Sequence, residues 1–441
     1  MKCLILAAGR GSRIAKRGDS KPLISFLGLT LIERVILAAS KSGISEFYVV
    51  TGYNNTKLEH FLQALSRERK IPIIPIRNYD WKAENGISVL KAKELLNENF
   101  ILLMSDHIFD ESILVNLKNQ TLNDGEVMLA VDYNTESNGL VDIDDVTKVL
   151  VSDGKLLGIG KTIDNYNAYD TGIFLCSPSI FDSVEKSIAG GDSSLSGGMK
   201  VLIKDGKARA FDIAGKFWID IDDENALKKA KRGVLRSTLG KFADGPVSRY
   251  LNRPVSIRIT EWLLKTNITP NQVSTISFIL SVTGAIFFLF EGYLNLVAGA
   301  ILAQFASIID GSDGEIARLK FKASEFGGWY DAVLDRYADA FLLFGLTWHV
   351  FSSNRSFYIL LIGFLSIIGS FMNSYTADKY DGLMKRKLTA MGSYFRIGRD
   401  VRIFTIFVGA MLNLPLLTLT LIALIMNAEN VRRVIIIKKN G

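Results

Sequence analysis

The sequence predicts two structural classes in one chain: an α/β fold with a mostly parallel, Rossmann-like sheet, followed by an all-α domain of six transmembrane helices. Three observations support this prediction. In the first half of the 441 residues, strand-like apolar runs alternate with amphipathic helical patterns. From about residue 273 onward, apolar runs reach the length of a membrane span. The basic residues of the second half lie between these runs, as expected for a membrane protein.

The composition excludes several other classes of protein. Cys3 and Cys176 are the two cysteines, too few for a disulfide framework or a four-cysteine zinc site. The formal net charge is +7, and basic residues lie beside the apolar runs. This position favours a membrane surface over nucleic acid as the partner of the basic residues. The apolar stretch 3–8 is too short for a secretory signal peptide, so we expect the first half to stay on the cytoplasmic side.

Residues 1–232 carry the α/β pattern. Strands are expected at residues 3–7, 47–51, 72–76, 100–104, 127–131 and 172–175, and helices at 31–42, 56–67 and 87–96. Strands that alternate with helices usually pair in parallel through right-handed crossovers. The sequence therefore predicts a largely parallel sheet in this first domain.

A connector and six membrane spans follow. Residues 233–272 are basic and amphipathic, with Arg258 and Trp262 among them, and we interpret them as an interfacial connector on the membrane surface. An ordinary surface helix is the alternative. Spans are expected at about 273–290, 292–310, 331–351, 356–376, 400–413 and 415–428. Lysines and arginines gather in alternate connecting segments and in the C-terminal tail, which places both termini on the cytoplasmic side.

The first group of candidate functional residues lies in and after a glycine-rich loop that follows the first strand. The candidates are Ala7, Ala8, Gly9, Gly11, Arg13 and Lys21. Glycines at a strand end let backbone N–H groups approach phosphates, and cationic side chains neutralise the phosphate charge. The loop lacks both the GK[ST] of a P-loop and the GxGxxG spacing of a dinucleotide site. Taken alone, it fits a tight turn as well as a phosphate site.

Together with residues further along the chain, this loop resembles the signature of the nucleotidyltransferases that join a nucleoside triphosphate to a sugar phosphate or an alcohol phosphate. The resemblance covers about residues 1–230. It implies that Arg13 and Lys21 hold the triphosphate. It also implies that Asn85 and Ser88 contact the base and ribose, and that Lys161 meets the second substrate.

The same resemblance implies a site for Mg2+ or Mn2+. Asp106 ends a short apolar strand, and the segment 218–222 resembles the late strand that supplies a second carboxylate, from Asp220 or Asp222. These two aspartates share one face of a regular strand, so their spacing does not choose between them. For Asp106, a surface acid that caps a turn is the alternative. In the implied reaction, the alcohol phosphate attacks the α-phosphorus and pyrophosphate leaves.

The second group of candidates is acidic and lies among the predicted spans. Asp310 and Asp313 are three residues apart and Asp331 and Asp335 four, so each pair lies on one helix face. Two helices that each bring two carboxylates to the cytoplasmic end of a bundle can bind one or two divalent cations. Ionisable groups at membrane depth are costly, which favours a functional role over solvated loop acids.

The spacing DxxDGxxARx8GxxxDxxxD is complete in this chain and is similar to the signature of the CDP-alcohol phosphotransferases, over about residues 245–441. The implied metal ligands are Asp310, Asp313, Asp331 and Asp335. The resemblance also implies that Asp335 is the general base, and that Gly314 and Arg318 lie at the CDP diphosphate. Attack of an acceptor hydroxyl on the β-phosphorus would release CMP.

Two arginines are candidates for binding the acceptor. Arg399 and Arg402 are three residues apart in the basic segment 396–402, where related enzymes bind a phosphate of the acceptor. Such a pair can clamp one phosphate. The positive-inside pattern or a contact with lipid headgroups accounts for the same residues equally well.

The order of the two domains suggests that the first makes what the second consumes, so the nucleotide would be CTP. This arrangement resembles the bifunctional family of CTP:inositol-1-phosphate cytidylyltransferase and di-myo-inositol-phosphate-phosphate synthase. The resemblance implies a cytidylyltransferase domain at 1–232 and a phosphotransferase domain at 273–441. It further implies inositol 1-phosphate as substrate of both steps, CDP-inositol as the intermediate, and a homodimer surrounded by membrane lipid with both active sites cytoplasmic.

Two other functions stay open at this point. One is a phospholipid synthase whose second domain transfers the alcohol phosphate to a diglyceride-type acceptor; the basic segment 396–402 favours a phosphorylated acceptor instead. The other is a degenerate first domain that only binds or regulates. The presence of Arg13, Lys21, Asp106 and Asp220 argues against that second reading.

Overall fold

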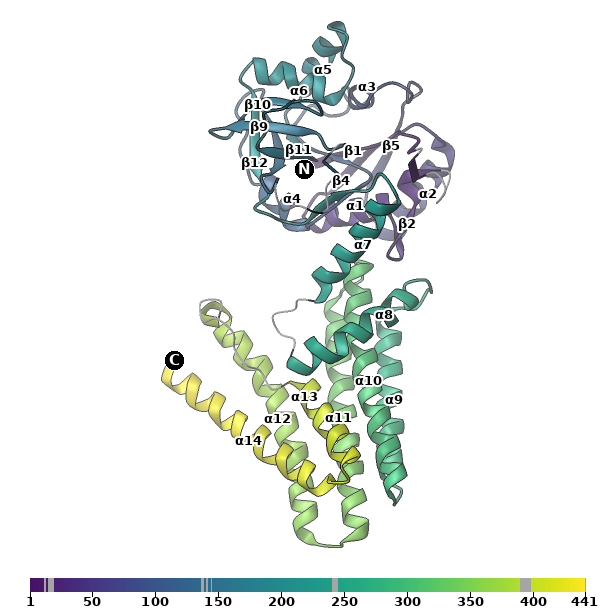
Figure 1. The fold of residues 1–441 in the computed structure, drawn as a ribbon, viewed down its shortest axis with the longest axis vertical. Helices are drawn as coiled ribbons and strands as arrows, with labels where there is room; N and C mark the ends of the chain where they lie inside the picture. Colours follow the sequence, from purple (N-terminus) through teal and green to yellow (C-terminus); the bar gives the residue numbers. More distant parts are fainter. Residues whose placement is uncertain are drawn as a thin grey trace. The chain divides into compact units, whose positions relative to one another are not determined.

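The computed structural model describes residues 1–11, 13–14, 20–135, 139, 142–143, 145–239, 245–388 and 398–440. The chain divides into two compact units, Met1–Val234 and Leu235–Gly441. The first is an α/β unit and the second is helical (Figure 1). Arg396 and Ile397, at the start of the predicted basic segment, lie outside the described residues.

A nine-stranded sheet forms the centre of the first unit. Its order is β5 (Ile73–Arg77), β4 (Glu46–Thr51), β1 (Lys2–Ala7), β6 (Phe100–Met104), β11 (Ala168–Cys176), β8 (Val127–Asp132), β12 (Ala208–Asp212), β10 (Lys155–Gly160) and β9 (Lys148–Ser152). The strands from β5 to β6 run parallel, as do β8 and β12. β11 is antiparallel to both neighbours, and β9 and β10 form an antiparallel hairpin.

The sheet is therefore mixed, and the predicted mostly parallel character holds for one side of it and not for the other. The hairpin gives the physical reason. β9 and β10 are joined by Asp153 and Gly154, which have φ values of 51° and 72°. A two-residue connection of this kind joins antiparallel strands, whereas a parallel pair needs a crossover of about a dozen residues.

The helices of the first unit follow the predicted alternation in part. They are α1 (Leu31–Lys41), α2 (Asn55–Arg69), α3 (Asn85–Leu90), α4 (Glu111–Leu117), α5 (Ser179–Ala189), α6 (Leu195–Lys204) and α7 (Glu224–Leu239). The predicted helices at 31–42 and 56–67 correspond to α1 and α2. The helix expected at 87–96 is shorter in the structure, because α3 ends at Leu90 and turns follow.

Strand register brings distant polar residues together at one edge of the sheet. The Ser105 amide donates to the Leu6 carbonyl at 3.1 Å, so the chain after β6 passes the end of β1. A separate two-stranded sheet pairs β7 (His107–Phe109) with β13 (Trp218–Asp220), and Asp220 lies opposite His107. Behind these polar ends the sheet is apolar, and Cys3 and Cys176 are fully buried free thiols within it.

The second unit consists of helices. They are α8 (Arg253–Leu263), preceded by a π-helical turn (Ser248–Asn252), then α9 (Pro270–Phe288), α10 (Tyr293–Leu319), α11 (Glu325–Ser353), α12 (Phe357–Leu388), α13 (Arg399–Met411) and α14 (Pro415–Asn440). Helices α9 to α14 lie where the six spans were predicted, and α10, α12 and α14 extend well beyond the predicted ends. Among the described residues, three segments are long and apolar enough to cross a membrane: Pro270–Phe288, Tyr293–Leu319 and Phe357–Ala377.

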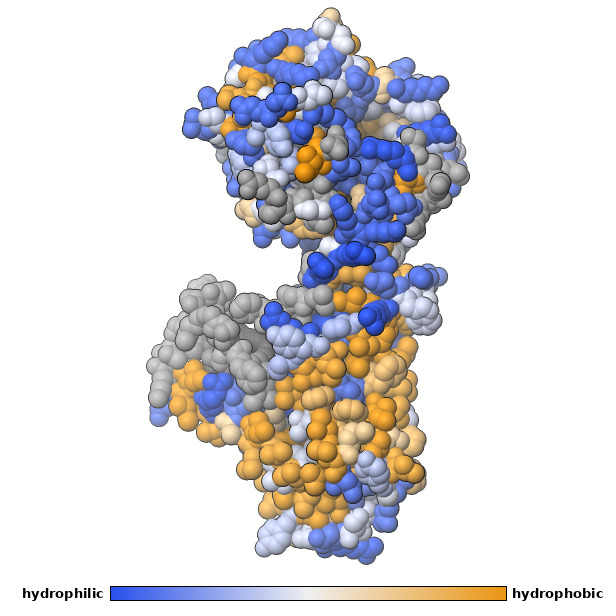
Figure 2. Space-filling model, in the orientation of Figure 1, coloured by the Kyte–Doolittle hydropathy of each residue, from blue (hydrophilic) through white to orange (hydrophobic). Residues whose placement is uncertain are grey.

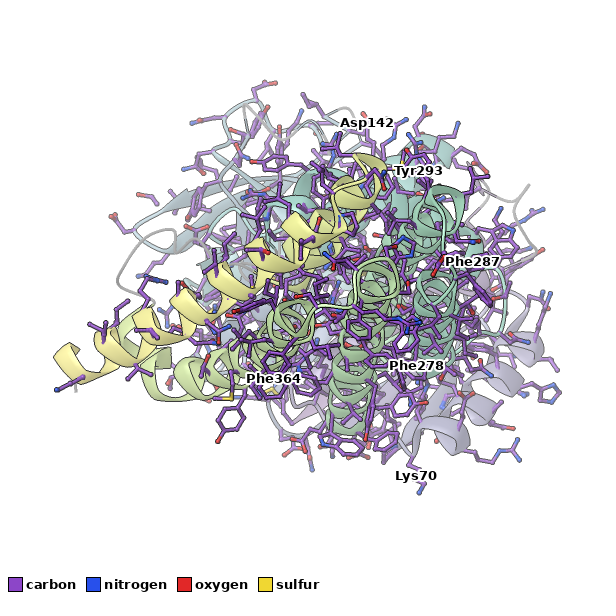
Figure 3. The ribbon with its side chains drawn as sticks, turned by 90° about the horizontal axis from the view of Figure 1, so that it is seen from below. Lys70, Asp142, Phe278, Phe287, Tyr293 and Phe364 are labelled. Atoms are coloured by element: carbon purple, nitrogen blue, oxygen red, sulfur yellow. The ribbon has the colours of Figure 1, made fainter. Side chains whose placement is uncertain are left out.

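The surface of the helical unit is apolar to a degree that water-soluble proteins avoid. Large hydrophobic side chains cover its outer face (Figure 2). Tyr293 and Phe364, both labelled in Figure 3, are 46% and 60% exposed. A contiguous apolar surface of this kind fits contact with lipid. Together with the three apolar helices, it indicates a membrane protein.

The amphipathic helix α8 is attached to α10 by buried polar groups. Glu315, on α10, is 1% exposed and accepts hydrogen bonds from Arg253 Nη1 (2.8 Å), Ser256 Oγ (2.7 Å) and Thr260 Oγ1 (2.6 Å). These three donors lie on one face of α8, whereas Trp262 on another face is 65% exposed. The predicted amphipathic character is therefore present, with a polar inner face that binds one carboxylate.

Glycines set the close approach of α9 and α10. A Cβ at Gly284 would lie 2.8 Å from the Gly299 carbonyl, and a Cβ at Gly299 would lie 2.6 Å from the Gly284 carbonyl. Both obstructing atoms belong to the backbone and cannot turn away. Small residues at such crossings are typical of membrane helix pairs, where close backbone packing replaces the hydrophobic effect.

This packing predicts that Gly299→Ala destabilises the helical unit. Overpacking against backbone costs about 1–3 kcal/mol, so the thermal midpoint of the detergent-solubilised chain should fall by several degrees in circular dichroism. Gly328→Ala is the control, because a Cβ at this position would meet nothing within 4 Å. This substitution should raise the stability of the helix by up to about 1 kcal/mol, because alanine favours the helical conformation more than glycine does. Equal midpoints for the two variants would contradict the packing argument.

Two candidate active sites

The first candidate site forms where β1, β6 and β13 end and β7 begins. Asp106 follows β6, and the pairing of β7 with β13 brings Asp220 beside it. Oxygen and nitrogen atoms of Asp106, His107 and Asp220 all lie within 4.8 Å of one another. His107 Nδ1 is 2.9 Å from Asp106 Oδ1 and 3.6 Å from Asp220 Oδ1. The arrangement is a compact cluster of side chains that could bind a metal ion.

Lys21 neutralises this cluster from the side of the glycine loop. Its ammonium group lies 2.5 Å from Asp106 Oδ2, 2.6 Å from Asp222 Oδ1 and 3.9 Å from Asp220 Oδ1. Burial disfavours the charge, but these carboxylates outweigh it and raise the pKa of Lys21 above its ordinary value. Gly11 has a φ of 65°, and a Cβ there would lie 2.5 Å from the Lys21 Cβ. A glycine is thus required where the loop passes the lysine.

The charged neighbours of Asp106 and His107 fix their protonation. Burial alone would raise the pKa of Asp106, but Lys21 and His107 hold it well below its usual range. Burial alone would lower the pKa of His107, but Asp220 and Asp106 raise it to about 9. At neutral pH the site therefore contains a carboxylate and an imidazolium in contact.

The structure separates the two carboxylates that the sequence could not distinguish. Asp222 lies 2.8 Å from Arg13 Nη2 and 2.6 Å from Lys21, so two cations bind it. The Oδ1 atom of Asp220 is buried without a hydrogen-bond partner among the described residues. Burial raises the pKa of Asp220 to about 7, and Asp106 and Asp222 add to the effect. An unsatisfied carboxylate oxygen beside Asp106 is what a bound divalent cation would satisfy.

Asp145 is a site residue that the sequence analysis missed. Its two oxygens lie 2.5 Å from Arg13 Nη1 and 2.6 Å from Lys161 Nζ. Asp145 therefore joins the predicted triphosphate-binding arginine to the predicted second-substrate lysine. No sequence spacing indicates this contact, since it depends on how the segment before β9 folds over the sheet. His107 was also missed, although it directly follows Asp106.

A cavity of about 920 Å3 is lined by half of the predicted site residues of this unit. Its lining includes Arg13, Asn85, Asp106, Lys161, Asp220 and Asp222. Gly9 lies in open space at the loop. Ala7, Ala8 and Ser88 are buried, and Ser88 Oγ accepts a hydrogen bond from Asn78 Nδ2 at 3.0 Å. Ser88 is thus held by the protein itself and does not line the cavity.

The second candidate site lies between α10 and α11. Carboxylate oxygens of Asp310, Asp313 and Asp331 lie within 4.8 Å of one another. Hydroxyl groups of α9 support two of them: Ser274 Oγ donates to Asp313 at 2.5 Å and Ser277 Oγ donates to Asp310 at 3.1 Å. Asp331 Oδ1 is buried without a hydrogen-bond partner among the described residues. The helical spacing therefore brings three of the four predicted carboxylates together.

The fourth carboxylate, Asp335, is held by Arg399. Arg399 Nη1 lies 2.6 Å from Asp335 Oδ1 and 3.1 Å from Asp310 Oδ2, and its Nε lies 3.1 Å from Asp339 Oδ1. Arg402, which is buried, contacts Asp339 Oδ2 at 2.6 Å. Asp339 thus orients both arginines. The sequence alone did not predict this role for Asp339. Gly314 follows Asp313 directly on α10 and Arg318 lies one turn further along the helix, and both are half-buried.

Both clusters fit a divalent cation of the Mg2+ or Mn2+ type. Each consists mainly of carboxylate oxygens, the donors that hard cations prefer. Each also contains one buried carboxylate oxygen that no described protein group satisfies, Asp220 Oδ1 in one and Asp331 Oδ1 in the other.

Comparisons with known proteins match a family to a part of each unit. A family model described as "MobA-like NTP transferase domain" matches residues 3–182, and one described as "CDP-alcohol phosphatidyltransferase" matches residues 267–435. The chain thus joins a nucleotidyltransferase to a CDP-alcohol phosphotransferase, and both parts are enzymes.

Relatives match over nearly the whole chain. The "Bifunctional IPC transferase and DIPP synthase" of Rubrobacter xylanophilus is 33% identical over 99% of this chain and 96% of its own. The Aquifex aeolicus protein with the same description is 31% identical over 99% of this chain and 98% of its own. The chain belongs to the family of bifunctional IPC transferases and DIPP synthases. Among solved structures, the inositol-1-phosphate CTP transferase from T. maritima is 24% identical, with a TM-score of 0.46, over 53% of this chain and 96% of that one.

The geometry predicts different effects for the two neighbouring aspartates. Asp220→Asn should raise the Mg2+ concentration needed for half-maximal nucleotidyl transfer by about tenfold or more, because a ligand is lost. Asp222→Asn should leave the Mg2+ requirement close to that of the unaltered chain and raise the KM for the nucleotide, because Arg13 and Lys21 lose a partner. Titrations with Mg2+ at saturating substrate would test this, and a shift confined to the Asp222 variant would reverse the assignment.

Proposed function

We propose that the first unit makes CDP-inositol from CTP and inositol 1-phosphate. A phosphate oxygen of inositol 1-phosphate attacks the α-phosphorus of CTP, a P–O bond forms, and pyrophosphate leaves with the electrons of the broken bond. Arg13 and Lys21 neutralise the triphosphate, and Asp106 with Asp220 would hold the divalent cation that assists the departure of pyrophosphate. Asn85 contacts the nucleoside. The domain that performs this step is residues 1–232.

We propose that the second unit consumes this product, through a domain at 273–441 that the segment 233–272 connects to the first. A hydroxyl of a second inositol 1-phosphate attacks the β-phosphorus of CDP-inositol, and CMP leaves. Asp335 takes the hydroxyl proton. Asp310, Asp313 and Asp331 would hold the cations that receive the diphosphate, with Asp335 completing the set. Gly314 and Arg318 adjoin it. The product is phosphorylated di-myo-inositol phosphate.

One observation carries this choice of acceptor: Arg399 contacts both Asp335 and Asp310. A phosphate bound by Arg399 and Arg402 would therefore lie next to the general base and next to the cation site. An acceptor that carries a phosphate can use this arginine pair to bring its hydroxyl to Asp335. A diglyceride has no phosphate for the arginines to bind, and so makes no use of this geometry.

We propose a location for both reactions on the cytoplasmic side of the cell membrane. The chain would cross the membrane several times with both termini in the cytoplasm, since lysines and arginines gather on the side of the α/β unit. Pairing of two copies through the helical unit would give a homodimer. The exposed apolar side chains of α9 to α14 support contact with lipid and with a second copy.

Two substitutions should separate the two activities. Asp106→Ala should abolish CDP-inositol formation from CTP and inositol 1-phosphate but leave transfer from supplied CDP-inositol close to normal. Asp335→Ala should do the reverse, since removal of a general base costs about 10²–10⁴-fold in rate. Product analysis with labelled CTP and Mg2+ would measure both steps. If the second unit transfers phosphoinositol to a diglyceride but not to inositol 1-phosphate, the proposed acceptor is wrong and the acceptor is a lipid.

A further inference from the structure

Helix α7 presents a polar, basic face to the cavity of the first unit. Four residues of α7 line the cavity: Asn225, Lys228, Lys229 and Arg232. They are spaced three, one and three residues apart, which places them on one side of the helix. Leu227 and Ala230, on another side, are buried. α7 is therefore fixed by its apolar side, and its basic side faces the substrate space.

Three basic residues of α7, Lys228, Lys229 and Arg232, differ from Arg13 and Lys161 in the same cavity because no carboxylate partner is present for them among the described residues. Arg13 and Lys161 are bound by Asp145, and Arg13 also by Asp222. Among the residues that the structure describes, no ion pair joins Lys228, Lys229 or Arg232. The positive charge of these three residues is thus available to an anion that enters the cavity.

The cavity has room for two substrates. Its volume of about 920 Å3 is at the upper end of the range of about 300–1,000 Å3 found for small-molecule sites. Arg13 lies at the end of the glycine loop, and Lys161 lies on the segment that follows β10. The cations of α7 follow Asp222 and Asp223 closely in the sequence, and these two aspartates also line the cavity.

We propose that Lys228, Lys229 and Arg232 form the binding subsite for the phosphate monoester of the second substrate of nucleotidyl transfer. This proposal rests on the proposed function, in which that substrate is an alcohol phosphate. A phosphate monoester carries close to two negative charges at neutral pH, and it requires several cationic donors. α7 supplies them in the same cavity as the carboxylates of the cation site. The subsite holds the attacking phosphate while Arg13 and Lys21 hold the triphosphate.

The test measures the KM for each substrate in the full chain. Lys228→Ala combined with Arg232→Ala should raise the KM for inositol 1-phosphate about tenfold or more, because two charge-assisted contacts are lost. The KM for CTP should change less than twofold. The salt dependence of the KM for inositol 1-phosphate should also weaken in the double variant. Arg232→Lys should keep most of the affinity that Arg232→Ala loses.

A matched control lies on the same helix. Lys231→Ala removes one positive charge, as Lys228→Ala alone does, from a residue that does not line the cavity, and both KM values should stay within twofold of those of the unaltered chain. Transfer from supplied CDP-inositol by the second unit, measured on the same preparations, shows that each variant chain is folded and inserted.

Each contrary outcome has a distinct meaning. If the unaltered chain releases no pyrophosphate from CTP and inositol 1-phosphate, the proposed function of the first unit fails. If it does so but the double variant keeps its KM for inositol 1-phosphate, or raises the KM for CTP instead, the proposed function stands and the α7 subsite is wrong. An equal rise for Lys231→Ala would also overturn it, because the effect would then belong to the helix and not to its cavity face.

Discussion

Carboxylates repel one another, and several of them can share a small space only where cations lie among them or where one of them takes up a proton. Both units of this chain meet that constraint with one central basic side chain. Lys21 contacts Asp106 and Asp222 and approaches Asp220. Arg399 contacts Asp310, Asp335 and Asp339. In each case the carboxylates come from different elements, so the basic residue determines how those elements meet, and the remaining acidic oxygens are left available to metal ions.

Contacts between residues close together in the sequence could be predicted at these sites, whereas contacts between residues far apart in the sequence could not. Asp310 and Asp313 lie on one helical turn, and helical geometry alone places their carboxylates together. The contact of Arg13 with Asp145 is different, because it depends on the fold of a segment far along the chain. The choice between Asp220 and Asp222 depended on the pairing of β13 with β7, which leaves one aspartate against the cluster and the other against Arg13 and Lys21. No residue spacing contains that information.

The same distinction holds for the fold. The alternation of strands and helices predicted the parallel side of the sheet, but the turn at Asp153 and Gly154 makes part of the other side antiparallel. In the helical unit the apolar runs predicted where the helices lie. They could not predict what holds the helices together, because lipid competes for apolar contacts. Two features hold these helices together. α9 and α10 cross at a pair of glycines, and the carboxylate of Glu315 on α10 accepts hydrogen bonds from three groups of α8. Glu315 also lies close after Asp310 and Asp313 on α10, so the attachment of α8 stiffens the helix that carries the acidic site.

The two native thiols lie inside the central sheet, where burial raises the pKa of Cys3 and of Cys176 and leaves almost no reactive thiolate. The chain has no other cysteine. A cysteine introduced on the surface of either unit would therefore be the one fast-reacting sulfur in the molecule. Spin labels or fluorophores can be attached at chosen positions in an otherwise natural sequence, and the separation between a label on each unit can be followed through successive turnovers in a bilayer.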